Sequence, residues 1–346
     1  MERAAHVGNS WRNHYDRLHL HTVRAQSSLP LFPMPSDWPR YPSRAQVVEY
    51  LERYTAHFRL AVEPGVEVRH VTPAASGWRV EAAHRTWQVA NVVFATGYNR
   101  VPKRPAFPGL DHFEGTCIHS AEYRSGREYT GQRVLVVGCG NSGAEIALDL
   151  CEQGAQAAIV VRGPVHVLPR DLYGRPAQLT SILLSRLPLP LADAIGGAVL
   201  RIAVGDLSRW GIRRPAKGPL RMVVEEGRVS LLDVGTVARI KAGEIPVHPG
   251  VEAVEARAVR FVDGRTLPFD AIILATGYRS GLGDLLPLPD VLDARGLPLR
   301  HGAEVRPGLW FCGYRNPPTG ALREIALEAP RIAAGIAARR EGLVDG

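Results

Sequence analysis

Three glycines near the middle of the chain, Gly138, Gly140 and Gly143, follow an apolar run at the spacing Gly-x-Gly-x-x-Gly. Residues 134–137 are continuously apolar, and residues 144–150 place apolar side chains at helical spacing, as a buried strand and a helix require. A glycine turn between such elements lets the backbone approach the pyrophosphate of a dinucleotide at a helix N-terminus. The residues of this predicted dinucleotide site are Gly138, Gly140, Asn141, Ser142 and Gly143.

An arginine at the end of the next predicted strand bears on which nucleotide would bind. Residues 157–161 are apolar and lead to Arg162, where NAD-binding sites carry an acidic residue on the ribose hydroxyls. A carboxylate would repel a 2′-phosphate, whereas a guanidinium pairs with it through two hydrogen bonds. We therefore predict NADPH rather than NADH, with a solvated arginine at a strand end as the alternative.

A strand ending that occurs twice indicates a second nucleotide site. Residues 90–98 and residues 270–278 each read as an apolar strand that ends in Ala-Thr-Gly-Tyr. Small residues after a strand let the chain pass close to a dinucleotide, so the two copies predict two related binding domains. Gly97 and Gly277 would then lie beside the ligands, and Gly313 ends a third apolar run of this kind.

These patterns predict an α/β protein with two Rossmann-like, doubly wound domains. We expect the first domain to be discontinuous, over residues 1–125 and 278–346, and the second, over residues 126–277, to be inserted in it. The second domain would carry a helical insert at about 171–225. Shorter elements are expected as follows: a helix over 43–58 that Ser43 caps, an antiparallel meander with strands at 66–68, 78–80 and 86–89, and a helix over 321–340.

Composition excludes several other classes of protein. The 346 residues include 42 Lys and Arg against 34 Asp and Glu, a net charge of +8, but the arginines are scattered and form no nucleic-acid motif. The most apolar stretch, 179–204, carries charges and prolines that disfavour a membrane span, so we expect two amphipathic helices over an apolar pocket. His19 and His21 alternate on a strand-like segment with no carboxylate at ligand spacing, so no metal site is predicted.

The cysteines indicate the redox compartment. Cys117, Cys139, Cys151 and Cys312 lie far apart, and no two of them have Cys-x-x-Cys spacing. This spacing argues against a disulfide reductase, and together with the lack of a secretory signal it predicts a reducing, cytoplasmic location.

Residues 113–123 carry the most specific motif of the chain. They read Phe-Glu-Gly-Thr-Cys-Ile-His-Ser-Ala-Glu-Tyr and fill every fixed position of Phe-x-Gly-x-x-x-His-x-x-x-Tyr. This motif resembles the identifying motif of the flavin-containing monooxygenases, and Tyr123 in place of Trp distinguishes it from the Baeyer–Villiger branch. Packing between elements is an alternative role for its side chains. Further segments resemble the YUCCA-type indole-3-pyruvate monooxygenases: 15–22, 165–170, 214–220 and 232–235.

The resemblance implies a flavin-dependent monooxygenase. NADPH would reduce FAD, dioxygen would form a flavin 4a-hydroperoxide, and an aromatic 2-oxo acid such as indole-3-pyruvate would be decarboxylated oxidatively. An arginine would meet the substrate carboxylate, and the sequence does not identify which one; it also leaves the oligomeric state open. His21 would lie near the reactive edge of the flavin as a tentative catalytic residue, with a purely structural histidine as the alternative. The residues implied along FAD are Glu2, Trp11, His21, Thr22 and Gly97.

One departure from the resemblance affects the first domain. Residues 1–3 resemble the end of the family's second strand, so the first strand and its glycine turn are absent from this sequence. We therefore expect a truncated FAD domain that binds FAD weakly, if at all. Two alternatives to the 2-oxo acid activity stay open: an N- or S-oxygenating flavin monooxygenase on the same scaffold, and a flavin-free NADPH-binding remnant.

Overall fold

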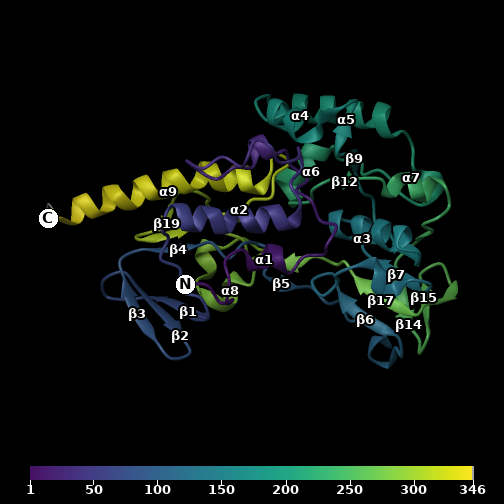
Figure 1. The fold of residues 1–346 in the computed structure, drawn as a ribbon, viewed down its shortest axis with the longest axis horizontal. Helices are drawn as coiled ribbons and strands as arrows, with labels where there is room; N and C mark the ends of the chain where they lie inside the picture. Colours follow the sequence, from purple (N-terminus) through teal and green to yellow (C-terminus); the bar gives the residue numbers. More distant parts are fainter. Residues whose placement is uncertain (345–346) are drawn as a thin grey trace. The chain divides into compact units, whose positions relative to one another are not determined.

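The computed structural model describes residues 1–344, which fold into two compact units (Figure 1). Unit 1 consists of Met1–Asn13, Thr22–Val101 and the described part of Tyr278–Gly346, and unit 2 consists of His14–His21 and Pro102–Gly277. The chain therefore leaves unit 1 and later returns to it. The boundaries differ from those predicted, because residues 14–21 and 102–125 lie in unit 2.

Unit 2 is built on a five-stranded parallel sheet in the order β13-β8-β7-β17-β6. Its strands are β6 (Thr116–His119), β7 (Arg133–Val137), β8 (Gln156–Val160), β13 (Val247–His248) and β17 (Ala271–Leu274). All of β17 and the last four residues of β7 are buried, as their continuous apolar runs predict for strands covered on both faces. Because β6 pairs with the interior strand β17, the segment before residue 126 folds with this sheet.

A small antiparallel sheet and two helices cover the parallel sheet. The antiparallel strands are β14 (Val251–Val254), β15 (Ala258–Phe261) and β16 (Thr266–Pro268), and the helices are α3 (Asn141–Glu152) and α7 (Thr236–Lys241). Leu135 and Ile272 of the parallel sheet share one apolar cluster with Val259 and Phe261 of the antiparallel one. The helix α3 packs against β7 and β8, so the turn between β7 and α3 is held by a well-packed core.

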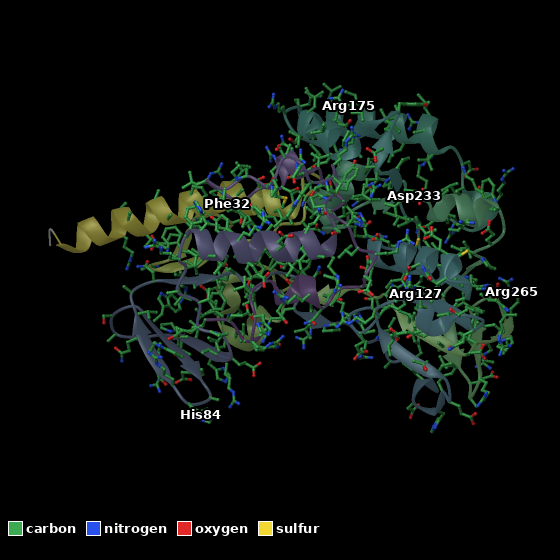
Figure 2. All side chains as sticks on the ribbon, viewed as in Figure 1. Phe32, His84, Arg127, Arg175, Asp233 and Arg265 are labelled. Carbon is green, nitrogen blue, oxygen red and sulfur yellow. The ribbon has the colours of Figure 1, made fainter. Side chains whose placement is uncertain are left out.

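The helical insert of unit 2 lies between two paired strands, β9 and β12, which run parallel. Its elements are β9 (Val167–Pro169), β10 (Asp171–Leu172), β11 (Arg175–Pro176), α4 (Ala177–Leu184), α5 (Leu189–Val204), η4 (Ser208–Trp210), α6 (Pro219–Glu226) and β12 (Leu231–Asp233). Two helices thus form within the predicted stretch 179–204, and Arg175 marks the insert in Figure 2. Helix α5 buries Ala192 and Leu200 and leaves Leu191 and Ile202 exposed.

Unit 1 contains two three-stranded sheets with a shared core. The strands are β1 (Val68–Pro73), β2 (Trp78–Ala82) and β3 (Thr86–Val89) in an antiparallel meander, and β4 (Val92–Phe94), β20 (Leu309–Phe311) and β19 (Glu304–Arg306) in the second sheet. Trp78 and Val80 pack in one cluster with Phe94 and Phe311. The meander begins at Val68, two residues later than predicted. The strand expected over 90–98 is limited to β4, whose middle residue is 41% exposed.

Two helices of unit 1, α2 (Arg44–His57) and α9 (Ala321–Val344), form where the sequence predicts them, and the others are short. The short ones are α1 (Asn9–Arg12), α8 (Leu282–Leu285) and the 3-10 helices at Arg24–Gln26 and Pro289–Val291. Ser43 caps α2 and exchanges hydrogen bonds with Gln46 in a capping box, which fixes where the helix begins. Phe32 stacks on Tyr50 of α2, and Figure 2 shows it beside that helix.

The remaining short elements lie near the connections between the units and in unit 2. They are β5 (Val101–Pro102) and β18 (Tyr278–Arg279), which pair with each other, and 3-10 helices at Leu110–His112 and Gly126–Tyr129.

Candidate functional site

The glycine turn of unit 2 has the geometry that an anion site needs. Gly138 has φ of 119°, and a Cβ there would lie 2.4 Å from the Ala275 oxygen; a Cβ on Gly143 would lie 2.0 Å from the Gly138 oxygen. These two glycines are therefore required by the packing of the protein itself. A Cβ on Gly140 would meet nothing within 4 Å, so only Gly140 borders open space where a phosphate would lie.

The start of α3 adds backbone donors to this turn. Gly140 is the N-cap residue, and no side chain caps the first turn of the helix, so its N–H groups are left for an anion. The Asn141 Oδ1 accepts a hydrogen bond from the Leu232 N–H at 2.8 Å, which ties α3 to β12. Ser142 is the second residue of α3. The turn therefore fits a dinucleotide pyrophosphate through its backbone.

The Arg162 guanidinium is free beside this turn. Arg162 follows β8 and is exposed, and none of the described residues forms a hydrogen bond or ion pair with it. Many exposed arginines of this chain pair with a carboxylate, such as Arg260 with Glu252. An unpaired guanidinium at the end of β8 is what a 2′-phosphate would require.

Two turns of unit 1 lie side by side. Gly97 and Gly313 follow the adjacent parallel strands β4 and β20, and they have φ of 71° and 79°. The Thr96 and Tyr314 hydroxyls are 2.7 Å apart and join the two turns. A Cβ on Gly97 would meet nothing within 4 Å, so the backbone there is open to a ligand, as an FAD site at this edge would need.

The other predicted FAD residues have mostly local surroundings. The Glu2 Oε1 accepts from the Ala4 N–H at 2.9 Å, and the Thr22 hydroxyl lies 2.8 Å from the Ser27 hydroxyl. Trp11 is part of α1 in unit 1. His21, in contrast, belongs to unit 2, and so do Gly277 and the glycine turn. The backbone of Gly277 is left-handed, with φ of 81°.

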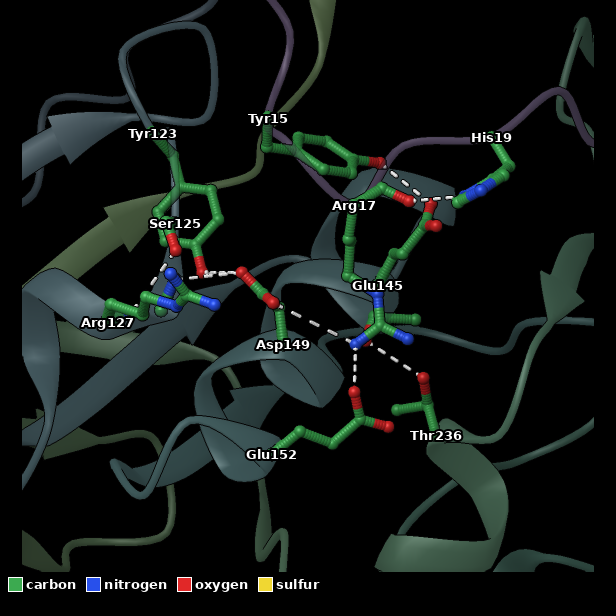
Figure 3. A network of polar contacts seen from close by, with 12 residues as sticks. Tyr15, Arg17, His19, Tyr123, Ser125, Arg127, Glu145, Asp149, Glu152 and Thr236 are labelled. Atoms are coloured by element: carbon green, nitrogen blue, oxygen red, sulfur yellow. Dashed lines mark hydrogen bonds and ion pairs between the residues drawn. The ribbon is translucent and has the colours of Figure 1, made fainter. Parts of the chain in front are cut away.

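Two buried carboxylates of α3 organise a polar network that the sequence analysis did not identify (Figure 3). The Glu145 Oε2 accepts from the Tyr15 hydroxyl at 2.9 Å. The same oxygen lies 3.1 Å from the His21 Nε2. Burial, and after it the Glu145 carboxylate, raises the pKa of Tyr15 well above its usual range. Glu145 and Asp149 are the two acids of the otherwise apolar stretch 144–150, and acids in such a stretch are the signal that could have revealed the network.

The second carboxylate of the network is Asp149. Its Oδ2 accepts from the Tyr123 hydroxyl at 2.6 Å and from the Gly126 N–H at 2.8 Å. Burial, followed by the hydrogen bond to Asp149, raises the pKa of Tyr123. Arg17 contacts Asp149 at 3.9 Å and Glu152 at 2.5 Å (Figure 3). Residues 14–21, which have no regular pattern, are thus fixed to α3 by polar contacts.

The motif at 113–123 has an evident packing role inside unit 2. His119 is fully buried, and its Nε2 lies 3.1 Å from the Gly277 oxygen while its Nδ1 accepts from the Ala121 N–H. Burial lowers the pKa of His119, which favours the neutral ring. A Cβ on Gly115 would lie 2.7 Å from the Phe113 ring. The motif therefore holds β6 and the Gly277 turn in place.

A small hollow lies under α5, where an apolar pocket was predicted. Leu200 and Val204 of α5 line it together with Val167, His166 and Arg214. The Arg214 Nη2 donates to the Gly205 oxygen at 2.7 Å. The hollow is small and lined partly by polar groups, so the apolar substrate pocket stays a prediction.

The described residues also bear on disulfides, metal sites and membrane-spanning helices. All four cysteines are free thiols. In residues 1–344 we find no group of three or more His, Cys, Asp or Glu side chains that could hold a metal ion. No helix of that part of the chain combines the length and the apolar composition needed to cross a bilayer.

Comparison with known proteins identifies the family. A protein-family model described as pyridine nucleotide-disulphide oxidoreductase matches residues 2–171. The chain is 39% identical over 327 residues to indole-3-pyruvate monooxygenase YUCCA1 of Oryza sativa subsp. japonica, which covers 91% of this chain and 80% of that protein. It is also 39% identical over 350 residues to indole-3-pyruvate monooxygenase YUCCA6 of Arabidopsis thaliana, covering 97% and 83%.

A solved structure agrees on the fold. The flavin-containing monooxygenase from Stenotrophomonas maltophilia has a TM-score of 0.71 at 23% identity, covering 97% of this chain and 90% of that one. With its glycine turn, its Phe-x-Gly-x-x-x-His-x-x-x-Tyr motif and these relatives, the chain belongs to the YUCCA-type family of FAD- and NADPH-dependent monooxygenases.

Proposed function

We propose that this chain uses NADPH and dioxygen to convert an aromatic 2-oxo acid, such as indole-3-pyruvate, into the corresponding acetic acid. In this reaction the 2-oxo acid, O₂, NADPH and a proton give the acetic acid, CO₂, NADP⁺ and water. The YUCCA relatives that support this substrate are indole-3-pyruvate monooxygenases by name. FAD, when bound and reduced, supplies the oxygen-activating chemistry, and the protein's part is to orient the reactants and exclude water.

Two features of unit 2 carry the coenzyme part of this proposal: open space at one glycine of the turn and a guanidinium that is unpaired in the described part of the chain. Gly140 borders space that no Cβ would fill, and the Arg162 guanidinium has no partner among the described residues. We assign the pyrophosphate of NADPH to the turn 138–143 and its 2′-phosphate to Arg162. The backbone at Gly97 and Gly313, where two parallel strands end side by side, is assigned to FAD.

We expect the flat ring of the substrate to pack against apolar side chains of the helical insert, as the sequence predicts. The four free thiols accord with the reducing, cytoplasmic location that we propose for the protein.

The proposal is tested with purified protein, FAD, NADPH and indole-3-pyruvate under air. We expect one indole-3-acetate formed per NADPH consumed, measured by chromatography and by absorbance at the NADPH band. Trimethylamine and methimazole serve as competing substrates for N- and S-oxygenation. Oxygenation of these compounds with no turnover of the 2-oxo acid would assign the chain to the other branch of the scaffold. NADPH binding without oxidation of any substrate would contradict the monooxygenase activity.

A further inference from the structure

Glu145 is buried on α3, two residues after Gly143 of the predicted pyrophosphate turn, and it contacts His21. Its side chain is 6% exposed, and that of His21 is 16% exposed. The Tyr15 hydroxyl donates to the Glu145 Oε2 at 2.9 Å, and the His21 Nε2 lies 3.1 Å from the same oxygen. Glu145 therefore joins Tyr15 and His21 to the helix that begins at the predicted pyrophosphate turn.

The hydrogen bonding of Glu145 fixes the tautomer of His21. A carboxylate accepts hydrogen bonds and donates none, so the 3.1 Å contact between the Glu145 Oε2 and the His21 Nε2 is made by an N–H on Nε2. In a neutral ring with Nε2–H, the Nδ1 carries a bare lone pair. That Nδ1 is buried and has no hydrogen-bond partner. A buried acceptor without a partner is costly, unless a ligand supplies the donor.

The side of the sheet on which His21 lies indicates which part of the coenzyme it would meet. Arg162 ends β8, which neighbours β7 on one side, and is assigned to the 2′-phosphate of the adenosine half. The segment containing His21 is attached beyond the other side of β7, where the Asp16 N–H donates to the Arg124 oxygen after β6. A dinucleotide whose pyrophosphate sits on the turn after β7 extends its second half to that side.

We propose that Glu145 is a positioning residue that holds His21 as the Nε2–H tautomer, so that the His21 Nδ1 accepts a hydrogen bond from the carboxamide NH₂ of the nicotinamide. The inference rests on NADPH docking at the turn, as proposed above. A carboxamide matches the site because it offers N–H donors, whereas a carboxylate or phosphate would meet the lone pair of Nδ1 with another lone pair.

The test compares two coenzymes by isothermal titration. NADP⁺ carries the carboxamide, and its 3-acetylpyridine analogue carries a methyl group in place of the NH₂. Glu145→Gln brings an amide NH₂ to this position; when the NH₂ faces the ring it donates to it, Nε2 becomes the acceptor and Nδ1 gains the proton. We expect Glu145→Gln and His21→Phe each to raise the Kd for NADP⁺ about tenfold, since a buried donor loses its acceptor. The Kd for the analogue should stay within about twofold of the wild-type value.

A spectroscopic measurement keeps the test independent of binding strength. In ¹⁵N-histidine-labelled protein, with His21 assigned by the His21→Phe spectrum, the wild-type ring should show the Nε2–H pattern of ¹⁵N shifts. Glu145→Gln should show the Nδ1–H pattern. Glu152→Gln is the matched control, because Glu152 lies on the same helix but pairs with Arg17 near the surface; it should change neither the tautomer nor the Kd.

Three results would overturn the inference. One is an unchanged NADP⁺ affinity in Glu145→Gln with a flipped tautomer, and another is an equal loss for NADP⁺ and its analogue. The third is a wild-type protein that binds neither coenzyme, which would also refute NADPH docking at the turn. The first two results leave that docking intact, so the two failures are distinguishable.

Discussion

At the scale of single residues, Arg162 has the largest consequence for coenzyme choice. Its guanidinium is unpaired among the described residues. We predict that Arg162→Glu raises the KM for NADPH by about 10- to 100-fold, because charge-assisted hydrogen bonds are replaced by repulsion. The KM for NADH should fall, because a carboxylate can accept from the ribose hydroxyls. Steady-state kinetics with both coenzymes measure this change.

The control for this substitution is Arg186→Glu, which changes the same charge in the exposed loop between α4 and α5. It should leave the ratio of the two KM values unchanged. Equal ratios in both variants would show that Arg162 acts only through net charge.

Glu328 gives a residue-scale prediction about pH. Burial raises the pKa of its carboxyl, although its Oε2 accepts from the Gly313 N–H at 2.9 Å. The pKa of Glu328 is higher in the folded than in the unfolded protein. Its protonated carboxyl therefore contributes to the free energy of unfolding at low pH, and this contribution is lost as the pH rises from about 4.3 through the folded pKa. We predict that Glu328→Gln is more stable than the wild type at pH 8, and that the difference shrinks toward pH 4.5. Urea unfolding across that range measures it, and parallel stability curves would contradict it.

At the scale of elements, the turn between β7 and α3 contains one glycine that leaves room for a ligand and another that the packing of the protein requires. Gly140→Ala should leave the free energy of unfolding within about 0.5 kcal/mol of the wild type, since its Cβ meets nothing. NADP⁺ affinity should fall, because the methyl group occupies the ligand's space. Gly143→Ala should destabilise the protein by about 1–3 kcal/mol, since its Cβ would lie 2.0 Å from the Gly138 oxygen.

Denaturant unfolding and NADP⁺ titration of both variants check this pair. A Gly140→Ala protein that binds NADP⁺ as tightly as the wild type would show that the pyrophosphate does not approach that backbone.

Elements with a local signal could be predicted from the sequence, and elements fixed by distant partners could not. The capping box of Ser43 and Gln46 defines the start of α2, and the buried run of β7 with its glycines defines the turn. Residues 14–21 have no periodicity, and their place is set by contacts such as that of Tyr15 with Glu145, 130 residues away. The apolar residues of 90–98 predict a strand that is buried throughout. They do not reveal that one face of this strand is exposed to solvent.

At the scale of the whole molecule, the residues assigned to NADPH lie in one unit of the chain. The turn, Arg162 and His21 all belong to unit 2. A ligand slows hydrogen exchange where it stabilises the folded state. We predict that NADP⁺ protects amides in β7 and α3, and leaves the β1–β3 meander of unit 1 unchanged.

Exchange measured by mass spectrometry, with and without NADP⁺, tests this distribution. Adenosine monophosphate without the 2′-phosphate is the control ligand and should give weaker protection. Protection confined to unit 1 would contradict the assignment.

The return of the chain to unit 1 also has a consequence for synthesis on the ribosome. The strand β20 pairs with β4, and Trp310 bonds to Asn91 across 219 residues of sequence. All of unit 2 must therefore be translated before the second sheet of unit 1 can close. Until then β4 presents an unpaired edge, and such edges invite aggregation. A nascent polypeptide arrested after Gly277 should accordingly hold a finished unit 2 and depend on chaperones for the rest.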